Sequence, residues 1–157
     1  MASRIAPLAL LLLSCSLGCA SESQQVADTL DQGTLDFVGS DGRVIRSINI
    51  EIAASQATRQ QGLMDRRQLT LDQGMFFVFP APDSLSFWMA NTYIPLDIIF
   101  VGADSGIVNI AQRTTPLSRE YINSTGPAQY VVEVRGGFSE RFGIDESAKI
   151  RWQQNGL

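Results

Sequence analysis

Residues 34–53 read TLDFVGSDGRVIRSINIEIA, and this stretch decides the predicted fold class. In its second half Ile48, Ile50 and Ile52 alternate with polar residues, which is the period of a β-strand that buries one face. The GSDG segment at residues 39–42 contains the residue types that favour a tight turn between two strands. The stretch therefore predicts a β-hairpin.

Similar short segments follow along the chain, separated by turn residues. Two short helices are expected, one that Ser55 caps and Gly62 ends, and one at residues 138–143. We predict a mainly β fold of the α+β type, with an antiparallel sheet that is barrel-like or sandwich-like. The further predicted strands lie within residues 74–80, 85–94, 96–113 with a turn at 102–106, 128–135 and 148–152.

The N-terminal residues have the layout of a secretory signal peptide. Residues 1–14 read MASRIAPLALLLLS, with a positive charge at Arg4 before an apolar run over residues 5–13. This run is too short to cross a bilayer as a helix. We therefore expect the protein to be exported to the cell envelope, on the periplasmic face or the outer surface.

Cys15 and Cys19 follow the apolar run in the segment LLLSCSLGCA, each after a small residue. This segment resembles the lipobox of bacterial lipoproteins, which implies cleavage before the cysteine and attachment of lipid to its thiol. Cys15 has the better leucine context and Cys19 has the Leu-Gly pair, so the predicted signal peptide ends at residue 14 or 18. The alternatives are cleavage without lipidation and a disulfide between the two cysteines.

The rest of the chain divides into a tether and one domain. Residues 15–32 are mostly small, polar and acidic, without a sustained hydrophobic period, and are predicted to form a flexible tether. Residues 33–157 are long enough for a single domain with its own hydrophobic core. Because no cysteine occurs after Cys19, we expect this domain to contain neither a disulfide nor a thiol nucleophile.

The composition excludes several classes of chemistry. The net charge is -4 and the basic residues are scattered, which argues against a nucleic-acid partner. The chain has no histidine, so catalytic triads and histidine-based zinc sites are excluded. It has no phosphate-binding glycine loop, and its only lysine, Lys149, lies in a predicted strand. We expect no cofactor.

Four motifs carry a family resemblance: RQQGLMDR at residues 59–66, GMFFVF at 74–79, FWMANTYIPLDIIF at 87–100 and YVVEVRGG at 130–137. Together they resemble the bacterial and archaeal family known as domain of unknown function 192, DUF192. The resemblance implies a small, mainly β fold and frequent export, with no established biochemical activity. The family often has a lysine inside the third motif where this chain has Ala90, which argues against a role for that amine here.

Asp97 stands out because it begins an apolar run, where an unpaired charge would be costly. It can accept backbone N–H bonds in the turn after Pro95, pair with Arg66, or contact a ligand. Phe87 and Trp88 fall on opposite faces of a predicted strand, so one of them is expected to be exposed and to suit a sugar, a peptide or another small polar ligand. The candidate ligand-binding residues are Arg66, Trp88, Asn91, Thr92 and Asp97.

Three methionines in the motifs offer a second kind of site. Met64, Met75 and Met89 carry thioethers of the type that binds Cu(I). Methionine beside aromatic residues more commonly fills gaps in a core, and this is the competing interpretation.

The acidic residues offer a third kind of site. Glu51 and Glu133 lie on the polar faces of their predicted strands and are expected to be solvated. A pair formed by Asp97 and Glu133 would suit the hydrolysis of a glycosidic bond if the fold brought the two carboxyl groups together.

These observations lead to one main hypothesis and two alternatives. We expect an envelope-anchored binding or assembly module rather than an enzyme, attached to the membrane through lipid. Its partner would be a small polar ligand or an envelope protein. The alternatives are a carboxylate-dependent hydrolase of an envelope polymer and a methionine-based Cu(I) site.

Overall fold

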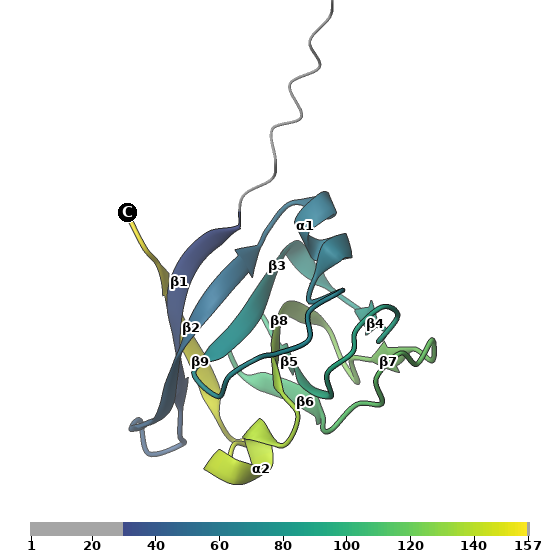
Figure 1. Ribbon diagram of the computed structural model, residues 1–157. Helices are drawn as coiled ribbons and strands as arrows, with labels where there is room; N and C mark the ends of the chain where they lie inside the picture. Colours follow the sequence, from purple (N-terminus) through teal and green to yellow (C-terminus); the bar gives the residue numbers. More distant parts are fainter. Residues whose placement is uncertain (1–29, 157) are drawn as a thin grey trace, which may run out of the picture.

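Residues 30–156 of the computed structural model fold into nine β-strands and two short helices (Figure 1). The mainly β fold with two short helices is therefore confirmed. Residues 1–29, which include the predicted signal peptide, both cysteines and most of the predicted tether, lie outside the described residues. The strands are β1 (Asp31–Val38), β2 (Val44–Ala53), β3 (Gln73–Asp83), β4 (Ser86–Phe87), β5 (Leu96–Val101), β6 (Ile107–Ala111), β7 (Ile122–Asn123), β8 (Ala128–Arg135) and β9 (Lys149–Gln154), and the helices are α1 (Gln56–Gln61) and α2 (Phe138–Phe142).

Seven of the strands form one mixed sheet in the order β6-β5-β8-β3-β2-β1-β9, and β4 pairs with β7 separately. All neighbours in the large sheet are antiparallel except β2 and β3, which are parallel because α1 and the following loop return the chain to the same end. The two edge strands approach each other at one bridge, between Gly106 and Lys149. The sheet is not closed into a barrel, which limits the barrel-like part of the prediction.

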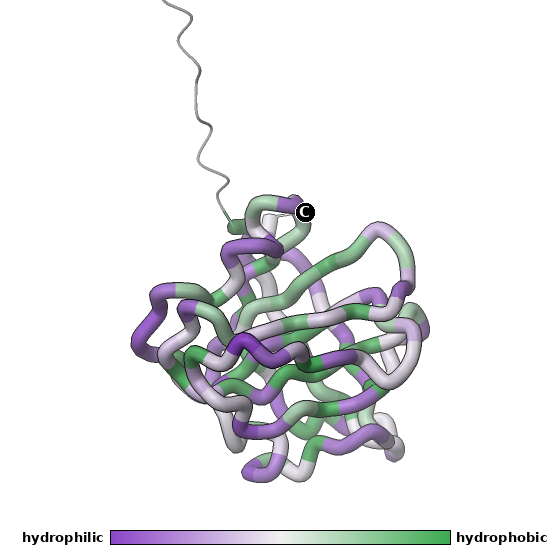
Figure 2. The backbone as a smooth tube through the Cα atoms, turned by 90° about the vertical axis from the view of Figure 1, so that its right-hand side faces the viewer, coloured by the Kyte–Doolittle hydropathy of each residue, from purple (hydrophilic) through white to green (hydrophobic). Residues whose placement is uncertain are grey.

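The hydrophobic core occupies both faces of this sheet. Phe76, Ile99 and Val132 pack into one cluster, while their neighbours Phe77 and Ile98 pack into the other, as expected where successive side chains alternate across a strand. Each fully buried side chain of this size contributes about 2 kcal/mol to folding. Figure 2 shows hydrophobic stretches in the middle of the molecule and hydrophilic ones on its peripheral loops. Among residues 30–156, no helix has the length and apolar composition needed to cross a membrane.

The predicted hairpin and first helix are confirmed. β1 and β2 pair with Leu35 opposite Ile48, and the chain turns at residues 39–42. β1 begins at Asp31, so the last two residues of the predicted tether belong to the sheet. Ser55 caps α1 by accepting a hydrogen bond from the Thr58 backbone N–H, within a capping box.

The predicted strand over residues 85–94 is wrong for most of its length. Only Ser86 and Phe87 are in a strand, because the chain turns directly afterwards. Asn91 has a positive φ of 57°, and the Thr92 N–H donates to the Met89 carbonyl across this turn. The partner strand β7 is only two residues long, which is too short for a periodic pattern to reveal. The turn places Trp88 and Thr92 beside α1 instead of along a sheet.

Gly33 allows β1 to lie close to β9. A Cβ atom at this position would lie 2.5 Å from the backbone carbonyl oxygen of Gln153, so the strands would have to separate. We expect Gly33→Ala to lower the free energy of unfolding by about 2 kcal/mol, measured by urea denaturation. Gly126→Ala is the matched control, because its Cβ would make only an ordinary contact at 3.4 Å with Val108. Equal stability of the two variants would contradict this account.

Candidate functional site

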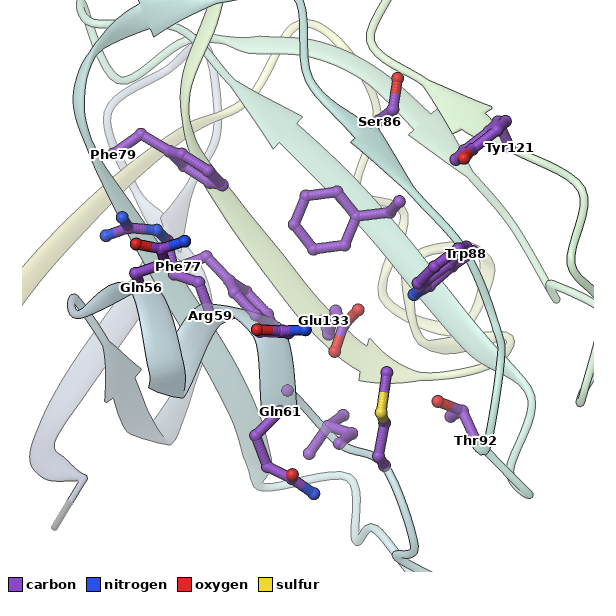
Figure 3. A pocket seen from close by; sticks show the side chains of 15 residues that line it. Gln56, Arg59, Gln61, Phe77, Phe79, Ser86, Trp88, Thr92, Tyr121 and Glu133 are labelled. Atoms are coloured by element: carbon purple, nitrogen blue, oxygen red, sulfur yellow. The ribbon is translucent and has the colours of Figure 1, made fainter. Parts of the chain in front are cut away.

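A pocket of about 340 Å³ lies between α1, the strands β3 and β8, and the turn after β4 (Figure 3). Its volume is at the lower end of the range of about 300–1,000 Å³ that is typical of sites for small ligands. The residues that line it are Gln56, Arg59, Gln60, Gln61, Gly62, Leu63, Met64, Phe77, Phe79, Ser86, Phe87, Trp88, Thr92, Tyr121 and Glu133.

Glu133 contributes a buried carboxyl group to this pocket. Its side chain comes from the C-terminal half of β8, and the residue is only 5% exposed. Within the part of the chain that the structure describes, the carboxyl has no hydrogen-bond or ion-pair partner. Burial raises its pKa from the ordinary value of 4.5 to about 8, so the protonated form predominates at neutral pH.

The expectation that Glu133 is solvated was therefore wrong. The alternation along β8 does place it on the face opposite Val132 and Val134. That face is also covered, because Leu63 and Met89 pack over it from the segments that follow α1 and β4. Residues on both faces of β8 are consequently buried.

Aromatic rings form one wall of the pocket. The Phe87 ring packs edge-on against Phe77, with 5.1 Å between ring centroids. Trp88 is 45% exposed and stacks on Tyr121 at the mouth, with 6.0 Å between centroids. The prediction that one residue of the pair Phe87 and Trp88 is exposed is confirmed.

Among the described residues, Arg59 is the only positively charged one that lines the pocket. Its guanidinium donates to the Val78 carbonyl at 3.0 Å and to the Ala54 carbonyl, and it lies 5.1 Å from the centre of the Phe79 ring. In Figure 3 Arg59 lies beside Gln56, whereas Glu133 lies farther along the pocket, toward Trp88. The Arg59 charge is thus held at the rim and does not pair with the buried carboxyl.

Residues 37–152 match the sequence family DUF192, described as "Uncharacterized ACR". The chain belongs to this family. A protein of unknown function from Novosphingobium aromaticivorans DSM 12444 has a similar solved structure, with 39% identity and a TM-score of 0.72 over 76% of this chain and 84% of that one. A protein from Sinorhizobium meliloti 1021, described as a candidate transcription regulator, gives 32% identity and a TM-score of 0.75 over 82% and 98%. No match was found among curated proteins.

The pocket gathers the motifs on which the DUF192 resemblance rests. The first motif contributes residues 59–64, the second contributes Phe77 and Phe79, and the fourth contributes Glu133. The third contributes a segment that includes the predicted residues Trp88 and Thr92. Four stretches that are far apart in the sequence therefore meet around one buried carboxyl group.

Asp97 lies outside the pocket and is fully buried among backbone donors. Its Oδ1 accepts hydrogen bonds from the N–H groups of Arg113 and Gly137, both at 2.8 Å, and its Oδ2 accepts one from Ser139 at 2.8 Å. The predicted pair between Asp97 and Arg66 is wrong. Arg66 instead forms a two-point ion pair with Glu51, with 2.8 Å between Nη1 and Oε1.

Asp97 and Glu133 lie on opposite faces of the sheet. In the β5–β8 ladder Asp97 pairs with Val134, and Glu133 pairs with Ile98, so each belongs to a different row of side chains. The fold therefore does not bring these two carboxyl groups together, and the alternative of a catalytic pair formed by Asp97 and Glu133 is ruled out. Within residues 30–156, Glu133 is the only acidic residue that lines the pocket.

The remaining candidates are divided between the pocket and its surroundings. Asn91 does not line the pocket, and its carbonyl accepts the Asp65 N–H at 2.8 Å.

Met64 lines the pocket, whereas Met75 and Met89 are fully buried in the core cluster, and the Met89 sulfur accepts the Thr114 hydroxyl at 3.1 Å. The three thioethers thus do not line one cavity. Among residues 30–156, no group of three or more Asp, Glu, Cys or His side chains is placed to hold a metal ion.

Two other hollows lie near the start of α2 and the end of β8. One, of about 480 Å³, has Arg113, Arg135 and Arg141 in its lining, and the other, of about 320 Å³, has Arg67 and Arg135. These arginines are exposed, and no described residue in either lining has a buried polar side chain. The pocket around Glu133 differs from both in holding a buried ionisable group.

Proposed function

We propose that this domain is a binding module whose ligand enters the pocket around Glu133. The apolar part of the ligand would pack against the rings of Phe77, Phe87 and Trp88, and its polar end would reach the buried carboxyl. The observation that carries the proposal is a carboxyl group without a partner among residues 30–156, at a pocket to which all four DUF192 motifs contribute.

The energetics of Glu133 support a role in binding. A buried polar group without a hydrogen bond costs stability, and an apolar side chain of similar size would avoid that cost. A strongly shifted pKa inside a concave site is typical of functional residues. A bound ligand that donates to the carboxyl would offset the penalty.

The composition of the pocket favours binding over hydrolysis. Glycosidases use two carboxyl groups that flank the scissile bond. Glu133 is the only acid that the described part of the chain contributes to the lining, and the other polar side chains there are mainly amides and hydroxyls. A binding module therefore remains the better hypothesis, and the ligand is small enough to enter a volume of about 340 Å³.

The proposed location is the bacterial cell envelope. The pattern of residues 1–14 supports export, and the context of Cys15 or Cys19 supports attachment through lipid. Since β1 begins at Asp31, the residues between the cysteines and this strand would form the tether. Metabolic labelling of cells with a fatty acid, compared between Cys15→Ser and Cys19→Ser, tests the anchor and identifies the modified residue.

A fragment screen followed by protein NMR tests the binding site. Compounds that combine an apolar ring with a hydrogen-bonding group should shift the resonances of Gly62, Glu133 and the Trp88 indole N–H. We expect Trp88→Ala to weaken the best compound by about tenfold without loss of folding, because Trp88 is half-exposed and contributes mainly ring contact.

Tyr93→Ala is the matched control for the Trp88 variant. Tyr93 is also an exposed aromatic residue, at 41%, but it does not line the pocket and lies under the Arg67 guanidinium. Its replacement should leave binding unchanged. The proposal fails if no compound shifts the pocket resonances, or if both variants weaken binding equally.

A further inference from the structure

We propose that the ligand presents a protonated amine on an apolar stem, and that Glu133 pairs with this amine inside the pocket. The inference rests on the proposed function and specifies the chemistry of the ligand. It starts from the state of the Glu133 carboxyl, which lies more than nine-tenths buried in the pocket lining with no protein donor on either oxygen in the described chain.

Gly62 leaves room above the carboxyl. A Cβ atom at Gly62 would lie 3.4 Å from the Phe77 ring and 3.9 Å from the Glu133 Oε2 atom, so a larger side chain would fill this space. Gly62 also has a positive φ of 48°, which suits glycine. The backbone at the end of α1 therefore keeps the approach to Glu133 open.

The charged groups around Glu133 do not compensate the negative charge that its ionised form would carry. Arg59 on α1 is engaged by two backbone carbonyls and the Phe79 ring. On the sheet, Glu51 is the next acid in the same row, since it pairs with Met75 and Met75 pairs with Glu133, and its charge is matched by Arg66.

The remaining polar groups of the pocket are not cationic side chains. Besides Glu133 and Arg59, the described residues of the lining include one further titratable group, the Tyr121 phenol at the mouth, and the remaining polar groups are amides, hydroxyls and the Trp88 indole N–H. No described cation lowers the pKa of Glu133, whose shift has burial as its only cause. A ligand cation would supply the charge that the protein does not.

The aromatic wall suits the same ligand. The faces and edges of Phe77, Phe87 and Trp88 offer apolar contact to a stem, and an ammonium group beside aromatic rings gains a cation–π attraction. An amine on an apolar stem thus matches both the rings and the carboxyl.

Binding of the ammonium should release a proton. Glu133 without ligand is mainly protonated at pH 7, whereas the ion pair requires the ionised carboxylate. When the ammonium ion binds, the protonated carboxyl therefore forms the ion pair and releases one proton to the solution. Affinity should rise about tenfold between about pH 6 and pH 7, continue to rise toward pH 8, and level off above it.

Isothermal titration of the purified full chain with phenethylammonium provides the test. Repeating the titration in two buffers of different ionisation enthalpy measures the protons released, which should be about 0.9 per ligand at pH 7. The neutral isostere 2-phenylethanol should bind at least about tenfold more weakly at pH 8 and release no proton. The side-chain amine of Nα-acetyl-lysine methylamide, in a parallel titration, distinguishes a peptide side chain from a free amine as the source.

Two variants complete the test. Glu133→Gln keeps the shape of the side chain and should abolish both the preference for the ammonium and the proton release, whereas the exposed Glu146→Gln should change neither.

Equal binding of the alcohol and the ammonium, or binding without proton release, would overturn the amine inference and leave the pocket as a site for a neutral ligand. If neither compound binds while the fragment screen finds neutral ligands at the pocket, only the amine inference fails. If no compound binds in the titration or in the fragment screen, the proposed function is overturned as well.

Discussion

Replacing Asp97 by alanine is expected to lower the free energy of unfolding by about 4 kcal/mol. The carboxylate is fully buried and accepts three backbone N–H bonds, from Arg113, Gly137 and Ser139. Hydrogen bonds to a charged acceptor are stronger than neutral ones, and alanine would leave three donors without their partner. Asp97 therefore ties β5 to the segment after β6 and to the beginning of α2.

Urea denaturation of three variants measures this effect. Asp97→Asn should be intermediate, at about 2 kcal/mol, because its amide can still accept at one atom but places a donor against the third N–H. Asp31→Asn is the control, because Asp31 is exposed and should change stability by less than about 0.5 kcal/mol. A loss below about 1 kcal/mol for Asp97→Ala would show that the three bonds do not hold these segments together.

The stability of the protein should fall as pH rises from about 5 to about 8, by about 4 kcal/mol in total, because of Glu133. The pKa of its carboxyl is about 8 in the folded state and near 4.5 in the unfolded state. The folded state therefore holds a proton that the unfolded state releases over this range, at about 1.4 kcal/mol per pH unit. Below the unfolded pKa the penalty vanishes, and above pH 8 it reaches its limit.

Glu133→Gln isolates this contribution, because glutamine keeps the size of the side chain and does not titrate. We expect the variant to be more stable than wild type at about pH 8 and similar to it at about pH 5, as measured by urea denaturation at each pH. Glu146→Gln should retain the wild-type dependence, since Glu146 is exposed. Parallel pH curves for wild type and Glu133→Gln would mean that the carboxyl is not held in a desolvated pocket.

The sequence predicts the local elements of this fold well. The alternation of Ile48, Ile50 and Ile52 identifies β2 because a buried face requires a period of two. Ser55 and Gly62 mark the ends of α1 because capping depends on neighbouring backbone groups. The parallel pairing of β2 with β3 has no comparable local signal, since it depends on the path of the chain between them.

The candidate site was harder to predict because its groups meet through distant segments. The three donors to Asp97 are 16, 40 and 42 residues away along the chain. The sequence therefore shows that a charged residue stands in an apolar run, but it does not show which groups bind the carboxylate. The alternation along β8 predicts a solvent-exposed Glu133, because alternation identifies the two faces of a strand but does not show that both are covered. Trp88 and Thr92 line the pocket, although no local pattern in the sequence predicts the turn that brings them there.

Because β9 pairs with β1, the domain cannot complete its sheet until the end of the chain has been synthesised. The first strand lies between β2 and β9, and contacts such as that between Arg151 and Asp36 join residues 115 positions apart. Such distant pairing is slow to form, and it cannot begin before the last strand has left the ribosome. A chain that is still being synthesised therefore lacks β9, and its sheet is incomplete. That delay suits a polypeptide that must be threaded through a translocon before it folds, as the proposed export requires.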